Sequence, residues 1–330
     1  MEKALKETVL DCLHHVQGRW LTLRELEERT SLPAAQLQTE LRQFLQAGYS
    51  LEHHPRYGYR LTGVPDRLIP DEILRELKTQ IIGRDILTYE EADSTMNIAE
   101  EMAKKGAREG TCIFAEFQRK GRGRGRHNWL CPKYKGILMT AILRPRLGME
   151  RICFLAVMVA VAVAEAIRQS LSLEAMIKWP NDIMIRGKKT CGILVDAETH
   201  KGKEPYFMAG IGLNVNLTRR DLPRDVIIPT TSLSIEKGRR IERTALARAL
   251  LESLDKWYLL LKAGDYKSIK ERWTELSQII GQRVRVEEKD KEYIGKVIDL
   301  SSFGGLIMEL DGGRRKTLKG EYLVVKEVLS

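Results

Sequence analysis

Leucine and valine residues recur at helical spacing in three short stretches of the first 63 residues. Spacing of three or four residues places apolar side chains on one face of a helix, so we expect three helices in close succession. In the connection between the second and third helices, Ser31 can serve as an N-cap and Pro33 suits the first helical position. The apolar positions are Leu5, Val9, Leu10, Leu13, Leu23, Leu26, Leu37, Leu41 and Leu45.

Two segments of alternating character follow Gly48, namely Tyr49–His53 and Tyr57–Leu61. Alternation on both sides of a short polar turn is typical of a β-hairpin. Three helices followed by a hairpin predict that residues 1–63 form a winged helix-turn-helix. A small three-helix dimerisation or docking module is the alternative.

A proline-containing, charged linker is predicted over residues 64–83, and the pattern then changes to apolar strands that alternate with helices. This pattern predicts an α/β or α+β domain over 84–277. From about residue 278, short β segments separated by glycine pairs predict a small β-barrel over 278–330. Expected strands are Thr111–Glu116, Ile137–Leu143, Ala175–Trp179, Ile183–Ile185, Gly192–Asp196, Phe207–Asn216, Arg283–Glu287, Tyr293–Asp299, Leu306–Leu310 and Tyr322–Val325; expected helices are Thr95–Lys105, Arg151–Leu171 and Thr244–Leu261.

Size and composition fit a multidomain globular protein. The 330 residues exceed what one hydrophobic core usually organises. The longest apolar run, Ile152–Ala164, is about half the length of a membrane span, so it predicts a buried helix. The N-terminal residues lack the pattern of a secretory signal, and five scattered cysteines fit neither a disulfide framework nor a zinc site. We therefore expect reduced thiols, a cytoplasmic location, no resident metal site and no membrane partner.

The formal net charge of +10 favours acidic partners such as nucleotide phosphates, nucleic acid or an acidic protein. Residues 1–65 contribute nothing to this charge, because they hold eight Lys or Arg and eight Asp or Glu. The basic surplus lies mostly in the middle of the chain.

The segment Gln118-Arg119-Lys120-Gly121-Arg122-Gly123-Arg124-Gly125-Arg126-His127-Asn128-Trp129 directly follows an expected strand. Glycines let the backbone approach a phosphate, and guanidinium groups supply charge and fork-shaped donors, so this segment predicts an anion-binding loop. The alternative is a nucleic-acid-binding tract of the RGG type, although such tracts lie in disordered tails. The spacing fits neither the P-loop nor the Rossmann pattern.

Two further clusters lie close together in the sequence. Lys178-Trp179-Pro180-Asn181-Asp182 joins two expected strands, and Lys188-Lys189 precedes the strand that contains Gly192. Taken singly, the first is an ordinary hairpin turn and the second a solvated hairpin tip.

Taken together, these motifs resemble, in order and spacing, the family of bifunctional biotin–protein ligases and biotin operon repressors. Asp93-Ser94-Thr95, Gly210–Asn216 and Thr231-Ser232-Leu233 match further motifs of that family. The resemblance covers the whole chain. It implies a class II synthetase-like ligase core, with a central mixed β-sheet and helices on one side, and an SH3-like C-terminal β-barrel.

The resemblance also implies a reaction. Biotin would be activated with ATP and Mg²⁺ to biotinyl-5'-AMP and then transferred to a lysine of biotin carboxyl carrier protein. Lys189 would neutralise charge on the phosphate, and Asp182 would orient or deprotonate the acceptor lysine, although Asp182 could also simply cap its turn. The expected biotin and adenylate contacts are Ser94, Thr95, Gln118, Gly121, Arg122, Gly123, Arg124, Trp129, Lys178, Asn181, Lys189, Gly192 and Asn214.

Members of the family that carry an N-terminal winged helix also bind operator DNA, and we expect a homodimer when the adenylate is bound. The expected DNA contacts are Arg24, Gln36, Gln38, Thr39, Arg42, Arg56 and Arg60. The chain departs from the family at Met96, Arg126 and His127, and its third helix has no basic residue before Arg42. Two other functions fit the same motifs: a lipoate-type ligase, and a ligand-sensing DNA-binding regulator without catalysis.

Overall fold

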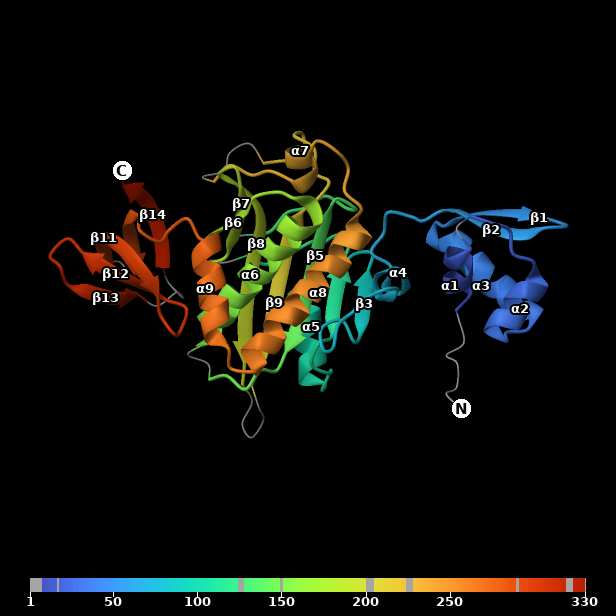
Figure 1. The fold of residues 1–330 in the computed structure, drawn as a ribbon, viewed down its shortest axis with the longest axis horizontal. Coiled ribbons are helices and arrows are strands. Elements are labelled where there is room, and N and C mark those ends of the chain that lie inside the picture. The colour runs from blue at the N-terminus through green and yellow to red at the C-terminus, as the bar shows by residue number, and fades with distance from the viewer. Residues whose placement is uncertain are drawn as a thin grey trace. The chain divides into compact units, whose positions relative to one another are not determined.

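The computed structural model of the 330-residue chain describes residues 8–16, 18–123, 128–148, 151–199, 205–223, 228–288 and 291–318, and the backbone of 323–329. The chain divides into two compact units, residues 1–67 and 68–330. Each unit is described by itself, with the elements labelled in Figure 1.

The first unit contains three helices, α1 (Val9–His15), α2 (Leu23–Thr30) and α3 (Ala34–Ala47), around one small apolar core. A capping box between Thr22 and Glu25 begins α2. The connection to α3 differs from the prediction. Ser31 is the left-handed C-cap of α2, and α3 begins at Ala34, whose N–H donates to Glu27 at 2.8 Å. Pro33 is the N-cap residue of α3, because its ring fixes an extended entry and it has no N–H to lose.

The expected hairpin is present as β1 (Ser50–His54) and β2 (Gly58–Gly63), which pair antiparallel. Leu21 forms an additional antiparallel bridge with Tyr59, so the hairpin is tied to the segment before α2. Leu21, Leu51, Tyr59 and Leu61 pack with the helical core.

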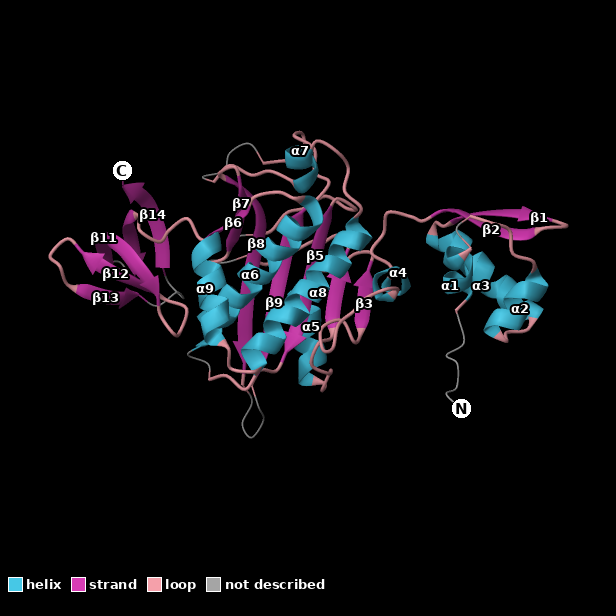
Figure 2. Cartoon of the chain, viewed as in Figure 1, coloured by secondary structure: helices cyan, strands magenta, loops and turns pink. Residues whose placement is uncertain are grey.

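The second unit is built on a seven-stranded mixed sheet in the order β3-β4-β5-β9-β8-β7-β6 (Figure 2). Only β3 and β4 are parallel; the remaining neighbours are antiparallel. The strands are β3 (Ile86–Tyr89), β4 (Cys112–Ala115), β5 (Gly136–Leu143), β6 (Ala175–Lys178), β7 (Asp182–Ile185), β8 (Lys188–Glu198) and β9 (Tyr206–Asn214).

Three long helices, α6 (Ile152–Leu171), α8 (Arg243–Lys262) and α9 (Tyr266–Leu276), cover one face of this sheet. The expectation of helices on one side only is wrong, because α5 (Thr95–Lys104) packs on the opposite face. Strand alternation explains the division: Cys112 and Phe114 point into the core beneath the long helices, whereas Ile113 between them joins the core of α5.

Helix α6 is longer than the apolar run that predicts it. Within the described residues it is the one helix that is long and apolar enough to cross a membrane, yet 72% of its most hydrophobic window is buried inside the fold. Its burial on both sides, against α8 and the sheet, confirms the expectation of a buried core helix.

The C-terminal residues form a five-stranded antiparallel sheet in the order β13-β12-β11-β10-β14. Its apolar face belongs to the same core cluster as the central sheet and α6. The strands are β10 (Arg283–Glu288), β11 (Lys291–Leu300), β12 (Leu306–Leu310), β13 (Arg315–Leu318) and β14 (Leu323–Leu329).

Several elements had not been predicted from the sequence. Helix α9 was missed because Lys, Arg and Glu interrupt its apolar stripe, although Ile269, Trp273 and Leu276 are buried. The other missed elements are short: α4 (Pro70–Leu74), β3, α7 (Leu233–Lys237) and β13.

Candidate active site

One cross-strand row of residues runs across six strands of the central sheet. Residues paired across neighbouring strands point to the same face of the sheet. The apolar residues one position before and after this row lie in the core under α6, so the row itself points to the opposite face. The residues paired in register are Lys178, Asp182, Gly192, Gly212, Leu138 and Ala115. The sheet thus brings the Lys178–Asp182 turn next to the strand that contains Lys189 and Gly192.

Two glycines in this row make a shallow trough that the indole of Trp129 fills. A β-carbon on Gly212 would lie 2.6 Å from the indole nitrogen, and one on Gly192 would lie 2.8 Å from the far edge of the ring. Only glycine therefore fits beneath Trp129 at either position. The indole N–H is buried and has no acceptor among the described residues.

Lys189 and Asp182 form an ion pair beside this trough. The lysine Nζ lies 2.7 Å from a carboxylate oxygen of Asp182, and their side chains are 22% and 12% exposed. The same Nζ lies 5.5 Å from the centre of the Trp129 ring. A bulge between Ile183 and Met184 shifts the register of β7 against β8 near this pair.

The backbone of Lys189 is held from outside the sheet. Its N–H donates to Pro229 O at 2.7 Å, and its carbonyl accepts from Thr231 N at 2.8 Å. Glu236 on α7 accepts from the Thr231 hydroxyl at 2.7 Å and pairs with Arg186 at 3.4 Å across the β7–β8 turn. Sequence reasoning missed Glu236, which lies beyond the matched Thr231-Ser232-Leu233 motif.

A second cluster, made of neutral polar groups, lies at the start of α5. Gln118 Oε1 accepts from the backbone N–H of Thr95 at 2.7 Å and from its hydroxyl at 3.0 Å. Thr140 on β5 donates to the same hydroxyl at 2.8 Å, and Ser94 caps α5. All four residues are buried, so this is a preformed set of hydrogen-bonding groups at the edge of the trough. Thr140 was not singled out from the sequence.

The arginine segment connects the two clusters. Trp129 N donates to Gly121 O at 2.9 Å, and Arg122 pairs with Asp196 on β8 at 2.9 Å. Gly123 lies in the described part of this segment. Arg124 and the departures Arg126 and His127 lie outside the described residues.

The two predicted asparagines differ in their relation to the site. Asn214 is buried at the end of β9; its amide nitrogen donates to Thr231 O at 3.1 Å, whereas its Oδ1 has no donor among the described residues. Asn181 does not reach the trough, because its Nδ2 donates to Ile193 O at 2.7 Å on the outer edge of β8. Lys178 lies in the cross-strand row with Asp182.

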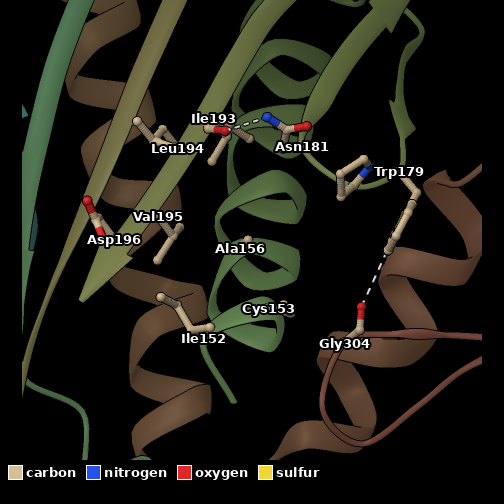
Figure 3. Close-up of a pocket in the computed structure, with 11 residues that line it drawn as sticks. Ile152, Cys153, Ala156, Trp179, Asn181, Ile193, Leu194, Val195, Asp196 and Gly304 are labelled. Atoms are coloured by element: carbon tan, nitrogen blue, oxygen red, sulfur yellow. Dashed lines mark hydrogen bonds between the residues drawn. The ribbon is translucent and has the colours of Figure 1, made fainter. Parts of the chain in front are cut away.

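A cavity of about 250 Å³ lies beyond Asn181, between the first turns of α6, strand β8 and the loop at Gly304 (Figure 3). Trp179 closes one side, and its indole N–H donates to Gly304 O at 3.3 Å. Of the predicted site residues, only Asn181 lines it. The cavity is therefore distinct from the trough under Trp129, although both border β8.

The cysteines supply no nucleophile to this site. All five are free thiols, as expected. Burial raises the pKa of Cys131 to about 12 and that of Cys191 further still. Both thiols therefore stay protonated at neutral pH.

The site has few carboxylates. Within the part of the chain that the structure describes, there is no group of three or more His, Cys, Asp or Glu side chains that could hold a metal ion. Asp182, in the cross-strand row, already faces an ammonium group.

The predicted DNA contacts are on the surface of the first unit. Gln36, Gln38, Thr39 and Arg42 are exposed along α3. Arg24 is exposed on α2 and pairs with Glu28, and Arg56 is exposed in the hairpin turn. Arg60 on β2 pairs with Glu52, and its guanidinium lies 4.7 Å from the centre of the Trp20 ring.

Comparison with known proteins agrees with this arrangement. Residues 89–216 match the model of the biotin/lipoate A/B protein ligase family, and residues 279–321 match that of the biotin protein ligase C-terminal domain. The chain is 29% identical over 316 residues to the bifunctional ligase/repressor BirA of Bacillus subtilis, covering 96% of this chain and 97% of that protein. It is 24% identical to the Escherichia coli protein of the same name, with 92% of each chain covered.

The solved structure of a biotin protein ligase from Aquifex aeolicus, in complex with biotin and ATP, superposes with a TM-score of 0.64 at 25% identity. It covers 74% of this chain and 99% of the Aquifex chain. Both family models and these full-length relatives lead to one assignment. The chain is similar to the biotin/lipoate A/B protein ligase family over residues 89–216, and to bifunctional ligase/repressor proteins over nearly its whole length.

Proposed function

We propose that the protein is an ATP-dependent biotin–protein ligase that forms biotinyl-5'-AMP and passes the biotinyl group to a lysine of biotin carboxyl carrier protein. One observation carries the proposal: a glycine-floored trough lies between a cluster of neutral hydrogen-bonding groups and a paired lysine and aspartate. An acyl-adenylate enzyme needs such a division, with a neutral site for the acid and a charged site for the phosphate.

Biotin has a flat bicyclic head with a polar ureido edge and an apolar chain. In the proposed complex, Thr95 and Gln118 hydrogen-bond the ureido edge, since both are buried and preformed. Ser94, the N-cap of α5, and Gly121 border the same end. The indole of Trp129 covers the two glycines, so in the proposed complex the apolar chain and the adenylate lie along the outer side of this ring and stack against it. The indole N–H of Trp129 and Oδ1 of Asn214 are buried polar atoms without a partner among the described residues, and a bound nucleotide would satisfy them.

In the first step, a carboxylate oxygen of biotin attacks the α-phosphorus of ATP, the bond to the β-phosphate breaks, and pyrophosphate leaves. Attack of one anion on another needs neutralising charge, and Lys189, with Arg122, supplies it in the proposed mechanism. Lys178 and, from its sequence motif, Arg124 are assigned further positive charge in this proposal. Mg²⁺ enters as the complex with ATP, in keeping with the few carboxylates of the site.

In the second step, the neutral amine of the carrier lysine attacks the acyl carbon of the mixed anhydride, and AMP leaves. Asp182 is the acid of the Lys178–Asp182 turn and lies in the same cross-strand row as the trough. We assign it the role of orienting the amine and accepting its proton.

Pyrophosphate exchange into ATP tests this function, with biotin, lipoate and octanoate offered separately. Exchange with biotin alone identifies a biotin ligase. Exchange with lipoate or octanoate identifies a lipoate-type ligase, and no exchange with any of the three leaves a DNA-binding regulator without catalysis.

For the homodimer, the free edge of β8 supplies the interface in our proposal. Strand β7 pairs with β8 only as far as Gly192, and beyond Asn181 none of the described strands covers that edge. An open edge is a template for strand pairing with another chain. Because Arg122 pairs with Asp196 on β8, contacts of the arginine segment with the adenylate would alter this edge.

We further propose three domains, namely a winged helix-turn-helix over 1–63, a ligase core over 84–277 after a linker, and an SH3-like barrel over 278–330. The first binds operator DNA in this proposal, and the protein works in the cytoplasm.

Two half-sites read by a dimer combine their contacts, so the adenylate-bound dimer binds DNA more tightly. Gel-shift titrations with DNA from upstream of biotin genes test this; equal affinity with and without biotin and ATP would exclude the regulation.

A further inference from the structure

Arg243, the first residue of α8, is completely buried and lies at a junction of three chain segments. Its NH1 donates to Glu116 Oε2 at 2.6 Å and to the carbonyl of Gly136 at 3.0 Å, and its NH2 donates to Glu116 Oε1 at 3.3 Å. Glu116 is 5% exposed and also accepts from the N–H of Leu68 at 2.7 Å.

Both partners of Arg243 are adjacent to residues of the candidate active site. Glu116 directly follows β4 and precedes Gln118 by two residues. Gly136 begins β5 and is the register partner of Asn214 on β9. The guanidinium of Arg243 therefore links the end of β4, which leads to Gln118, with the start of β5, which pairs with Asn214.

Stability alone gives little reason for charged groups at this junction. Removing two ions from water costs about as much as their attraction returns, and apolar side chains of similar volume often serve equally well. A guanidinium, in contrast, is a planar fork that fixes the direction of each of its partners. A rigid fork suits a place where strand ends must be held to a fraction of an ångström, as substrate contacts require.

We propose that Arg243 and Glu116 are positioning residues for ligand binding: they fix the end of β4 and the start of β5, and through them the places of Gln118 and Asn214. This inference rests on the proposed biotin-ligase function. Neither side chain touches the trough, so their effect passes through the backbone of two strands.

The chain offers a matched control. Arg272 on α9 pairs with Glu165 on α6, donating from Nε to Oε1 at 2.9 Å, and this carboxylate is also buried. The pair joins two helices and contacts no strand end of the site. Loss of either pair removes an ionic contact to a buried carboxylate, although Arg272 is 32% exposed and Arg243 is fully buried, and only the first loss is expected to alter ligand binding.

The test compares two double variants in the full chain, Glu116→Leu with Arg243→Met and Glu165→Leu with Arg272→Met. Replacing both partners avoids a stranded buried charge, so both proteins are expected to fold, as checked by circular dichroism. The readouts are the KM for biotin and kcat in pyrophosphate exchange, and the rate at which preformed biotinyl-AMP leaves the enzyme.

For the first double variant we expect the KM for biotin and the release rate of the adenylate each to rise at least about tenfold, with kcat within about threefold of wild type, because binding geometry is lost rather than chemistry. The control pair should stay within about threefold on all three measures. Glu116→Gln, which keeps the acceptor for Leu68 and Arg243, should lie nearer to wild type than the double variant.

A folded first variant with the same KM and release rate as the control pair would overturn the inference and leave Arg243 as a structural residue. Failure of the proposed function looks different, because the wild-type protein itself would then show no exchange with biotin.

Discussion

The ammonium group of Lys189 and the carboxylate of Asp182 lie 2.7 Å apart on neighbouring strands, beside the ring of Trp129. The pair leaves the unliganded site nearly neutral at its centre. A phosphate that binds to Lys189 must compete with Asp182, and release of Asp182 would make a base available for the second step. The two proposed catalytic residues are thus coupled before any substrate binds.

The first prediction concerns Lys189→Ala. Loss of one charge stabiliser of a developing anion typically costs about two to three powers of ten in rate, so pyrophosphate exchange with biotin should fall by that factor. Lys188→Ala is the matched control, because Lys188 is half exposed and lies near Glu236 rather than Asp182. Exchange within a few-fold of wild type in Lys189→Ala would remove this lysine from the mechanism.

Asp182→Asn should separate the two steps. The amide keeps the shape of the turn but accepts no proton, so transfer to the carrier lysine should slow by about 100-fold. Adenylate formation should change by less than about tenfold, because Lys189 keeps its charge. Single-turnover transfer from preformed biotinyl-AMP measures the second step alone. Equal losses in both steps would assign Asp182 to holding Lys189 and not to the carrier lysine.

Gly212→Ala should displace Trp129 from the trough. The added β-carbon would lie 2.6 Å from the indole nitrogen, so the ring must move. Overpacking of this kind costs about 1–3 kcal/mol, and we expect the KM for ATP or biotin to rise about tenfold or more. Gly312→Ala, where a β-carbon has no neighbour within 4 Å, is the control. Isothermal titration with biotin would measure the change; unaltered affinity would contradict the role of the glycine floor.

Asp221 gives a prediction of pH dependence. Hydrogen bonds from Lys135 and Thr218 lower the pKa of Asp221 from 3.8 to about 2. A depressed folded-state pKa stabilises the fold above the unfolded value of about 3.9, and this stabilisation disappears as the pH falls toward the folded-state pKa. Asp221→Asn should therefore lose about 1–2 kcal/mol at pH 7 after allowance for solvent screening, and less at pH 3. Urea unfolding at pH 7, 5 and 3 measures this; an equal loss of stability at all three pH values would contradict it.

The sequence is most informative where periodicity is strong. The expected helix Thr95–Lys105 and strand Ile137–Leu143 match α5 and β5 to within one residue. Ser31 was misassigned, because a serine beside a proline suits a helix start as well as a left-handed helix end. The place of α5 was also wrong: a helix pattern shows that one face is buried, but which side of the sheet it covers depends on strand register.

For the site, motif order was enough to name Lys189, Asp182, Trp129 and Gly192, which the sheet brings together. Residues that act across strands were not visible. Thr140, Glu236 and Arg243 lie in ordinary sequence surroundings, and only the pairing of β5 with its neighbours and the packing of α7 and α8 bring them to the site or to the segments that adjoin it. Asn181 was named from its motif, yet its amide faces the outer edge of β8.

The large apolar core extends without a break from the central sheet to the C-terminal sheet, and this limits where the gene can be divided. Val284, Val297 and Leu306 of the C-terminal sheet share one core with α6 and the central sheet, whereas the first unit keeps a core of its own. A recombination event at the Arg67–Leu68 junction would divide neither of these two cores. Truncation before β10 would instead expose apolar surface on both sides of the cut. The N-terminal unit can therefore be exchanged without dividing a core, whereas the C-terminal sheet has to stay together with the central sheet and α6.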